Sequence, residues 1–133
     1  MFQDCTNLRH LFLSENRITK VPPKLLHDKA VLKTVDLSRN QIKSIPEGFT
    51  KNNEGLENLY LNENLIEEIP MEVFDVNKKL KVVDLHKNRI RNVTPRGEKM
   101  KNENSPRVNL LDLRGNEKLG ILSKLFHRLV LLL

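Results

Sequence analysis

The sequence predicts an α/β solenoid, a curved stack of similar units with a parallel β-sheet on its concave face and irregular or short helical segments on its convex face. Asparagine recurs at Asn16, Asn40, Asn64, Asn88 and Asn116, and the first three intervals are 24 residues and the last is 28. Apolar residues keep the same phase relative to each asparagine. A fixed period of this length indicates a repeated supersecondary unit.

Five positions around each of the first four asparagines are always apolar. They are Leu8, Leu11, Leu13, Ile18 and Val21; then Leu32, Val35, Leu37, Ile42 and Ile45; then Leu56, Leu59, Leu61, Ile66 and Ile69; and finally Leu80, Val83, Leu85, Ile90 and Val93. Apolar residues alternate with exposed positions just before each asparagine, which predicts a short strand. One unit cannot bury its own apolar face, so the units must stack.

Each asparagine stands where the chain turns out of its strand. Its amide can bond to nearby backbone groups, and stacked copies can form a ladder. Pro22, Pro46 and Pro70 follow the last apolar position of the first three units and are expected to keep the outer segment extended.

Residues 8–22, 32–46 and 56–70 share the pattern L-x-x-L-x-L-x-x-N-x-I-x-x-I-P, allowing valine in apolar positions. This pattern resembles the leucine-rich repeat family over residues 2–121. The 24-residue period, with Phe49 and Phe74 on the outer arc, is similar to the "typical" subclass, which is common in Toll-type receptors and other cell-surface and matrix proteins. The resemblance implies the fold far more specifically than the function.

The expected organisation has three parts. Residues 1–7 are interpreted as the tail of a preceding repeat, because Phe2 lies six residues before Leu8 as Phe74 lies six before Leu80. Residues 122–133 are interpreted as an apolar C-terminal helix or a truncated segment. Five repeats lie between them, at 8–31, 32–55, 56–79, 80–107 and 108–121. We expect truncation at the N-terminus, since no polar cap precedes the first strand; the alternative is a short reading frame with an imperfect cap.

Composition excludes several classes of protein. The sequence contains no run of about 18 apolar residues, so no transmembrane helix is predicted. A single cysteine excludes an internal disulfide framework, and Cys5 is expected to face the core. No signal peptide is present, but expected truncation leaves the compartment open, including an extracellular or membrane-bound parent. The Asn92-Val93-Thr94 acceptor for N-glycosylation would have meaning only outside the cell.

No catalytic or cofactor site is predicted. The five glycines never cluster before a helix, and the four histidines lack metal-ligand spacing. His86 stands near Asp84 and, one repeat on, Asp112, but exposed strand residues of this kind are usually only solvated. We therefore expect a protein that is not an enzyme and that binds no cofactor or metal.

The solvent-facing strand positions are the candidate binding surface, which we call the concave face. Phe12 and Tyr60 share one column with Asp36 between them, and exposed aromatic residues are favoured interface anchors. The alternative for Phe12 is packing beneath an upstream repeat. The partner-binding residues predicted on this face are Phe12, Asp36, Tyr60, Asn62, Asp84, His86 and Arg114. The next column, Glu15, Arg39, Glu63 and Lys87, alternates in charge and predicts a ladder of ion pairs.

Function is predicted as recognition of a protein ligand by the concave face, in a fragment of a receptor or adaptor. The alternative is an intracellular scaffold or nucleic-acid-associated protein that uses residues 78–107. This segment has ten basic and three acidic residues, in a chain of net charge +6. Its basic patch would be Lys87, Arg89, Arg91 and Arg96. The lack of aromatic residues among them argues against base stacking. Partner identity and oligomeric state stay open.

Overall fold

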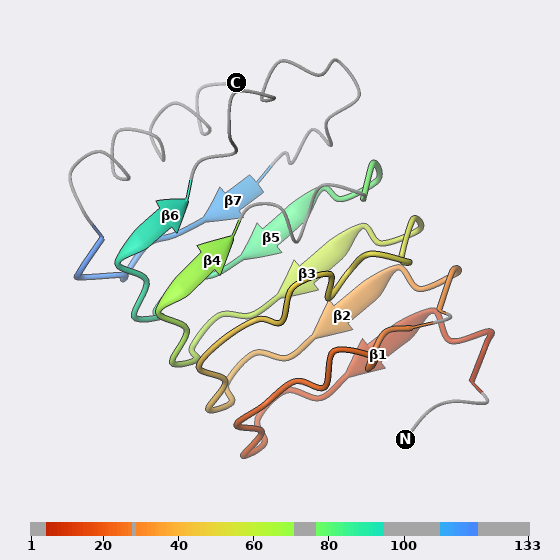
Figure 1. Cartoon of the computed structure of the whole chain (residues 1–133), viewed down its shortest axis with the longest axis horizontal. Helices are drawn as coiled ribbons and strands as arrows, with labels where there is room; N and C mark the ends of the chain where they lie inside the picture. The colour runs from red at the N-terminus through yellow and green to blue at the C-terminus, as the bar shows by residue number, and fades with distance from the viewer. Residues whose placement is uncertain (1–4, 28, 71–76, 95–109, 120–133) are drawn as a thin grey trace.

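The computed structural model describes residues 5–27, 29–70, 77–94 and 110–119. Five strands of three residues form one parallel sheet in the order β1-β2-β3-β5-β7, and two more form a second, parallel pair, β4-β6 (Figure 1). The strands of the large sheet are β1 (His10–Phe12), β2 (Thr34–Asp36), β3 (Asn58–Tyr60), β5 (Val82–Asp84) and β7 (Leu110–Asp112). The smaller pair is β4 (Glu68–Pro70) and β6 (Asn92–Thr94).

The large sheet is in perfect register along the stack. The middle residues of its strands, which point away from the concave face, pair with one another and are all buried; they are Leu11, Val35, Leu59, Val83 and Leu111. The flanking residues face solvent to different degrees. Period-two burial in β1, β2, β3 and β5 therefore separates the core from the concave face, as the alternation in the sequence predicts, whereas in β7 Asp112 is buried beside Leu111.

A residue in the left-handed backbone conformation lies three positions after each strand of the large sheet. Glu15, Arg39, Glu63 and Lys87 have φ values of 58°, 53°, 55° and 52°, and Gly115 takes the same place in the fifth segment with φ 72°. A positive φ reverses the chain sharply and brings the next residue, the repeated asparagine, under the sheet edge.

The asparagine ladder is confirmed. Asn40 donates from Nδ2 to the carbonyl oxygens of Leu13 at 2.8 Å and Leu37 at 3.1 Å, and its Oδ1 accepts from the backbone N–H of Ile18 at 2.9 Å. Asn64, Asn88 and Asn116 repeat this pattern. Each side chain thus joins its own turn to the turn before it.

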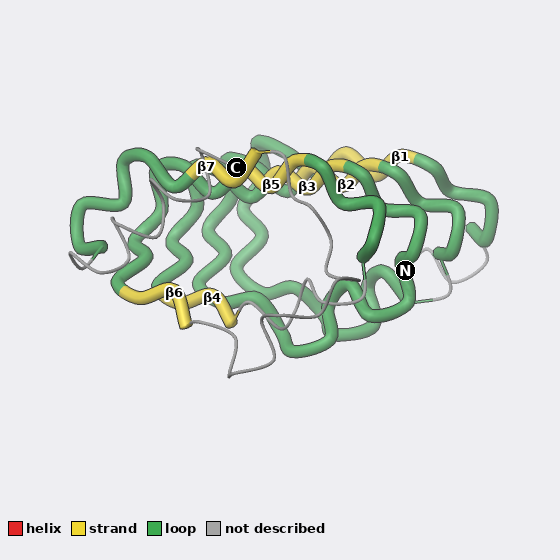
Figure 2. Tube along the Cα trace, turned by 90° about the horizontal axis from the view of Figure 1, so that it is seen from above, coloured by secondary structure: helices red, strands yellow, loops and turns green. Residues whose placement is uncertain are grey.

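The core lies between the large sheet and the convex segments (Figure 2). Sixteen of the 19 repeat positions whose side chains are described are buried; Leu8, Leu13 and Ile18 of the first unit are only partly buried. Phe49 is buried on the outer arc, whereas Phe74 lies outside the described residues. The described convex segments contain turns and the β4-β6 pair but no helix, so the expected short helices are not seen there.

A second amide ladder runs along the convex edge, and the repeat pattern did not predict it. Asn53 donates from Nδ2 to the carbonyl oxygens of Leu26 at 2.8 Å and Lys29 at 3.2 Å. In the orientation that satisfies its neighbours, the Asn77 amide donates to the carbonyl oxygens of Thr50 at 3.2 Å and Asn53 at 2.5 Å. Both asparagines are buried, so these bonds satisfy turns that water does not reach.

The expectation that Cys5 faces the core is wrong, because Cys5 is exposed. Cys5 stands 24 residues before Lys29 and 48 before Asn53, so it occupies the column of the second ladder. The side chain of Asn53 is covered by the turn around Leu26 in the preceding repeat, to whose carbonyl oxygen it donates a hydrogen bond. No described segment takes the corresponding place beside Cys5.

Candidate functional site

Four of the predicted binding residues, Phe12, Asp36, Tyr60 and Asp84, form one column on the concave face together with Asp112, which was not among them. The third residues of the five strands pair in sequence across the sheet: Phe12, Asp36, Tyr60, Asp84 and Asp112. Neighbouring strands lie about 4.8 Å apart, so a ligand lying across the sheet could touch several of them at once.

The aromatic end of the column is the most exposed apolar surface among the described residues. Phe12 is 65% exposed, and its ring stacks on that of His10 at a centroid distance of 6.2 Å. Tyr60 is partly exposed two strands away. The strand holds the apolar Phe12 ring in contact with water. A partner that covers the ring would bury apolar surface at little additional cost in conformational entropy.

The aspartates of the column share a second role. Asp36 accepts from the backbone N–H of Ser38 at 2.9 Å, Asp84 from that of His86 at 3.1 Å, and Asp112 from that of Arg114 at 3.0 Å. Each carboxylate therefore closes the turn after its own strand. The bond holds the backbone of Ser38, His86 or Arg114 at the point where the chain turns away from the sheet.

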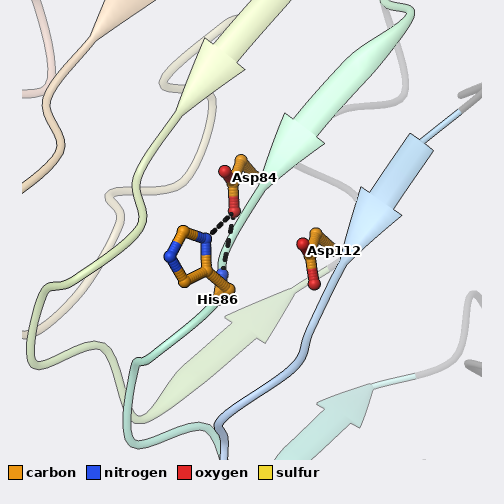
Figure 3. A group of neighbouring side chains, drawn as sticks. All are labelled: Asp84, His86 and Asp112. Carbon is orange, nitrogen blue, oxygen red and sulfur yellow. Dashed lines mark hydrogen bonds and ion pairs between the residues drawn. The ribbon is translucent and has the colours of Figure 1, made fainter.

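Asp84, His86 and Asp112 lie close together at the ends of β5 and β7, with the His86 ring on the side of β5 that faces away from β7 (Figure 3). The Nδ1 atom of His86 lies 2.7 Å from Oδ1 of Asp84, and its Nε2 lies 3.9 Å from Oε1 of Glu63. The imidazole therefore stands between two carboxylates. Asp112 is the paired residue of Asp84 on the next strand.

Arg114 covers Asp112. Its Nε lies 2.9 Å from Oδ1 and its second guanidinium nitrogen lies 2.5 Å from Oδ2, which is a bidentate ion pair. The Asp112 side chain is 8% exposed, so this predicted concave-face residue is buried beneath an arginine that is 79% exposed. Hydrogen bonding to Arg114 holds the pKa of Asp112 below its usual value of 3.8, although burial acts in the opposite direction.

The predicted ion-pair ladder forms in its first three members. Arg39 bonds to Oε1 of Glu15 at 2.6 Å and to Oε1 of Glu63 at 3.4 Å, and these bonds raise the pKa of its guanidinium. Lys87 makes no ion pair with a described residue. Since Arg39 is exposed, the ladder orders the surface more than it stabilises the stack.

These geometric features accompany a clear match to known proteins. A family model described as "Leucine rich repeat" matches residues 1–42 and 30–90. The chain belongs to the leucine-rich repeat family. A solved leucine-rich repeat protein of Leptospira interrogans is similar, with 25% sequence identity and a TM-score of 0.74 over 96% of this chain. The chain spans 30% of the length of that protein. No curated protein matches the chain.

Leucine-rich repeat folds generally mediate protein–protein interactions. No helix in the described ranges is long and apolar enough to cross a membrane.

The basic patch is only partly described in this leucine-rich repeat chain. Lys87, Arg89 and Arg91 are exposed, and Arg91 lies 3.8 Å from Glu67. Arg96 lies outside the described residues. The basic patch therefore stays a prediction.

Two further predicted residues lie elsewhere. Asn62, a predicted binding residue, is partly exposed beside the ion-pair ladder, and the side chain of Asn92, the predicted glycosylation acceptor, is not described.

Sequence spacing missed one member of the site. Glu63 was assigned to the ladder alone, yet it also faces His86. The 24-residue period places Glu63 one strand before Lys87, and His86, whose Nε2 lies 3.9 Å from Oε1 of Glu63, directly precedes Lys87. A comparison of neighbouring columns, and not only of positions within one column, could have placed Glu63 near His86.

Proposed function

We propose that this chain is a recognition module that binds a protein ligand on its concave face, as part of a receptor or adaptor of the "typical" repeat subclass. The observation that carries the proposal is the column from Phe12 to Asp84, in which the exposed Phe12 and the partly exposed Tyr60 alternate with carboxylates on the sheet. Aromatic anchors supply most of the binding energy in many interfaces, and the carboxylates add polar selectivity.

The division into five repeats at 8–31, 32–55, 56–79, 80–107 and 108–121 is part of this proposal. It assigns one strand of the large sheet to each repeat. A ligand that contacts Phe12 and Tyr60 together would therefore span the first three repeats.

A photocrosslinking experiment tests the proposed surface even when the partner has not been identified. A photoreactive phenylalanine analogue replaces Tyr60 in one variant and Lys51, exposed on the convex turn after Phe49, in the control variant. The protein is incubated with extract of the cells that produce it, and crosslinked partners are identified by mass spectrometry. We expect a protein captured from Tyr60 and not from Lys51.

The captured protein is then purified and titrated against the parent chain and Phe12→Ala, Tyr60→Ala and His86→Ala. We expect Tyr60→Ala to weaken binding by at least about tenfold, with most of the affinity kept between about 0.15 M and 0.5 M salt. Equal crosslinking from both positions would contradict the proposal. Binding of nucleic acid that falls steeply with salt would instead support the basic patch, because phosphate contacts release counterions.

A further inference from the structure

Two carboxylates face one another between β5 and β7. Asp84 is the register partner of Asp112, whereas Asp36 has Phe12 and Tyr60 as its partners on either side. Like charges opposite one another on neighbouring strands destabilise a sheet unless a cation compensates them. The column therefore changes character at its C-terminal end, from an aromatic and acidic surface to a place that attracts positive charge.

His86 adds an imidazole to this pair of carboxylates. One ligand atom from each of Asp84, His86 and Asp112 can be chosen so that all three lie within 4.8 Å of one another. The side chains of Asp84 and His86 are 21% and 25% exposed, so these two are partly open to solvent, whereas that of Asp112 is 8% exposed. The Oδ2 atom of Asp84 has no hydrogen-bond partner among the described residues.

This donor set suits a borderline-soft divalent ion. One imidazole nitrogen with carboxylate oxygens is a common zinc environment, whereas Mg²⁺ and Ca²⁺ prefer oxygen alone. Ligand atoms about 2.0–2.2 Å from zinc lie about 3.3 Å apart in a tetrahedral site. The widest separation here, at most 4.8 Å, must close by about 1.5 Å, which rotation of partly exposed side chains can supply.

The surroundings support the imidazole in a ligand role. The Nδ1 atom of His86 lies 2.7 Å from Oδ1 of Asp84, and its Nε2 lies 3.9 Å from Oε1 of Glu63. A metal-bound histidine usually donates its other ring N–H to a carboxylate, which fixes the tautomer and the orientation of the ring. Glu63 is in the position of such an outer carboxylate and is itself held by Arg39.

Arg114 is the cation that a metal must replace. Its guanidinium occupies both oxygens of Asp112, but the side chain is 79% exposed and can turn into solvent while Asp112 stays in place. The backbone N–H of Arg114 keeps its bond to Asp112 in either arrangement.

We propose that Asp84, His86 and Asp112 form a zinc site on the concave face, with Glu63 as the outer carboxylate and Arg114 as the resident cation that zinc displaces. The site does not depend on the proposed protein ligand. Water completes the coordination on the solvent side.

Isothermal titration calorimetry of the full chain with Zn²⁺ tests the site. All variants carry Cys5→Ser, because the exposed thiol of Cys5 could bind zinc by itself. We expect one Zn²⁺ bound per chain. Asp84→Asn, Asp112→Asn and His86→Ala should each weaken binding by at least about tenfold, and Mg²⁺ should not bind comparably. Circular dichroism without metal establishes that each variant is folded.

Asp36→Asn is the matched control, because Asp36 closes the same turn in an earlier repeat but has Ser38 where Asp84 has His86. We expect its zinc affinity to equal that of the parent. Arg114→Ala should bind zinc several-fold more tightly, since Asp112 is then released. Absence of saturable zinc binding, equal weakening in Asp36→Asn and Asp84→Asn, or binding that survives His86→Ala would overturn the proposal. Unchanged or weaker binding by Arg114→Ala would contradict the assignment of Asp112 as a ligand.

Discussion

The side-chain oxygen of Asn64 accepts a hydrogen bond from the backbone N–H of Ile42, 22 residues earlier, at 3.0 Å. The amide nitrogen of the same side chain donates to the carbonyl oxygen of Leu37, 27 residues earlier, at 2.9 Å. One buried side chain therefore satisfies two backbone groups of the preceding repeat as well as its own turn. The ladder acts between repeats, and its loss should be felt across the stack.

Replacement of Asn64 by alanine should lower the free energy of unfolding by about 1–3 kcal/mol, because the Ile42 N–H would be left buried without a partner and the Leu37 carbonyl would keep only its bond from Asn40. Urea unfolding followed by circular dichroism measures the change. Asn16→Ala is the matched control: Asn16 is exposed and bonds only to Leu13 and Ser14 in its own turn. Its effect should stay within about 0.5 kcal/mol. Equal losses in the two variants would show that the contacts between repeats contribute nothing.

The same repeat position should differ in importance along the chain. Leu61 is fully buried, whereas Leu13, two repeats earlier, is only partly buried. Leu61→Ala should destabilise the protein by about 2–5 kcal/mol, since it removes packed methyl groups and leaves a cavity. Leu13→Ala should cost less than half as much. Chemical denaturation of both variants under one set of conditions compares them, and a larger loss for Leu13→Ala would contradict this difference in burial.

The period of the sequence was sufficient to predict the sheet and its ladder. Buried apolar residues such as Leu59 and the turn residue Asn64 are determined by contacts that recur at every repeat, so their spacing carries the information. The parallel fold follows, because identical units that stack in one direction place equivalent strands side by side.

Features that depend on one particular neighbour could not be read in this way. Cys5 and Asn53 share a column, yet one is exposed and the other buried, because coverage depends on the adjacent turn. Asp112 was expected to face solvent, but its burial depends on the side chain of Arg114, two residues away. The facing of Glu63 and His86 likewise depends on side-chain conformations that a period does not specify.

Gly55 should not tolerate a larger residue. A Cβ atom there would lie 2.9 Å from the carbonyl oxygen of Ala30 and 3.3 Å from that of Leu32, both backbone atoms close to the glycine across the stack. Gly55→Ala should therefore destabilise the protein by about 1–3 kcal/mol through overpacking. Gly48→Asn is the comparison, because a Cβ at Gly48 meets only ordinary contacts and its φ of 67° is one that asparagine tolerates. Thermal melts should show a larger decrease in Tm for Gly55→Ala than for Gly48→Asn. The reverse order would mean that the backbone near Ala30 and Leu32 shifts to accommodate the added Cβ without loss of stability.

The ion pair of Asp112 with Arg114 should make folding sensitive to acid. Hydrogen bonding to Arg114 lowers the pKa of Asp112 below its ordinary value of 3.8 in the folded chain. A carboxyl group with a depressed folded-state pKa contributes stability above its unfolded pKa, and this contribution is lost as the pH falls through the folded pKa. The relevant window therefore lies below about pH 4.

Asp112→Asn keeps an oxygen that can close the turn to the Arg114 N–H but carries no charge. The parent should be more stable than this variant at pH 6, and the difference should shrink as the pH falls from about 4 toward 2, because the protonated aspartic acid also loses its ion pair. Urea unfolding at a series of pH values measures the difference. Asp36→Asn serves as control, since Ser38 gives Asp36 no cationic partner. A difference for Asp112→Asn that stays constant from about pH 6 to pH 2 would exclude ionisation of Asp112 as its cause.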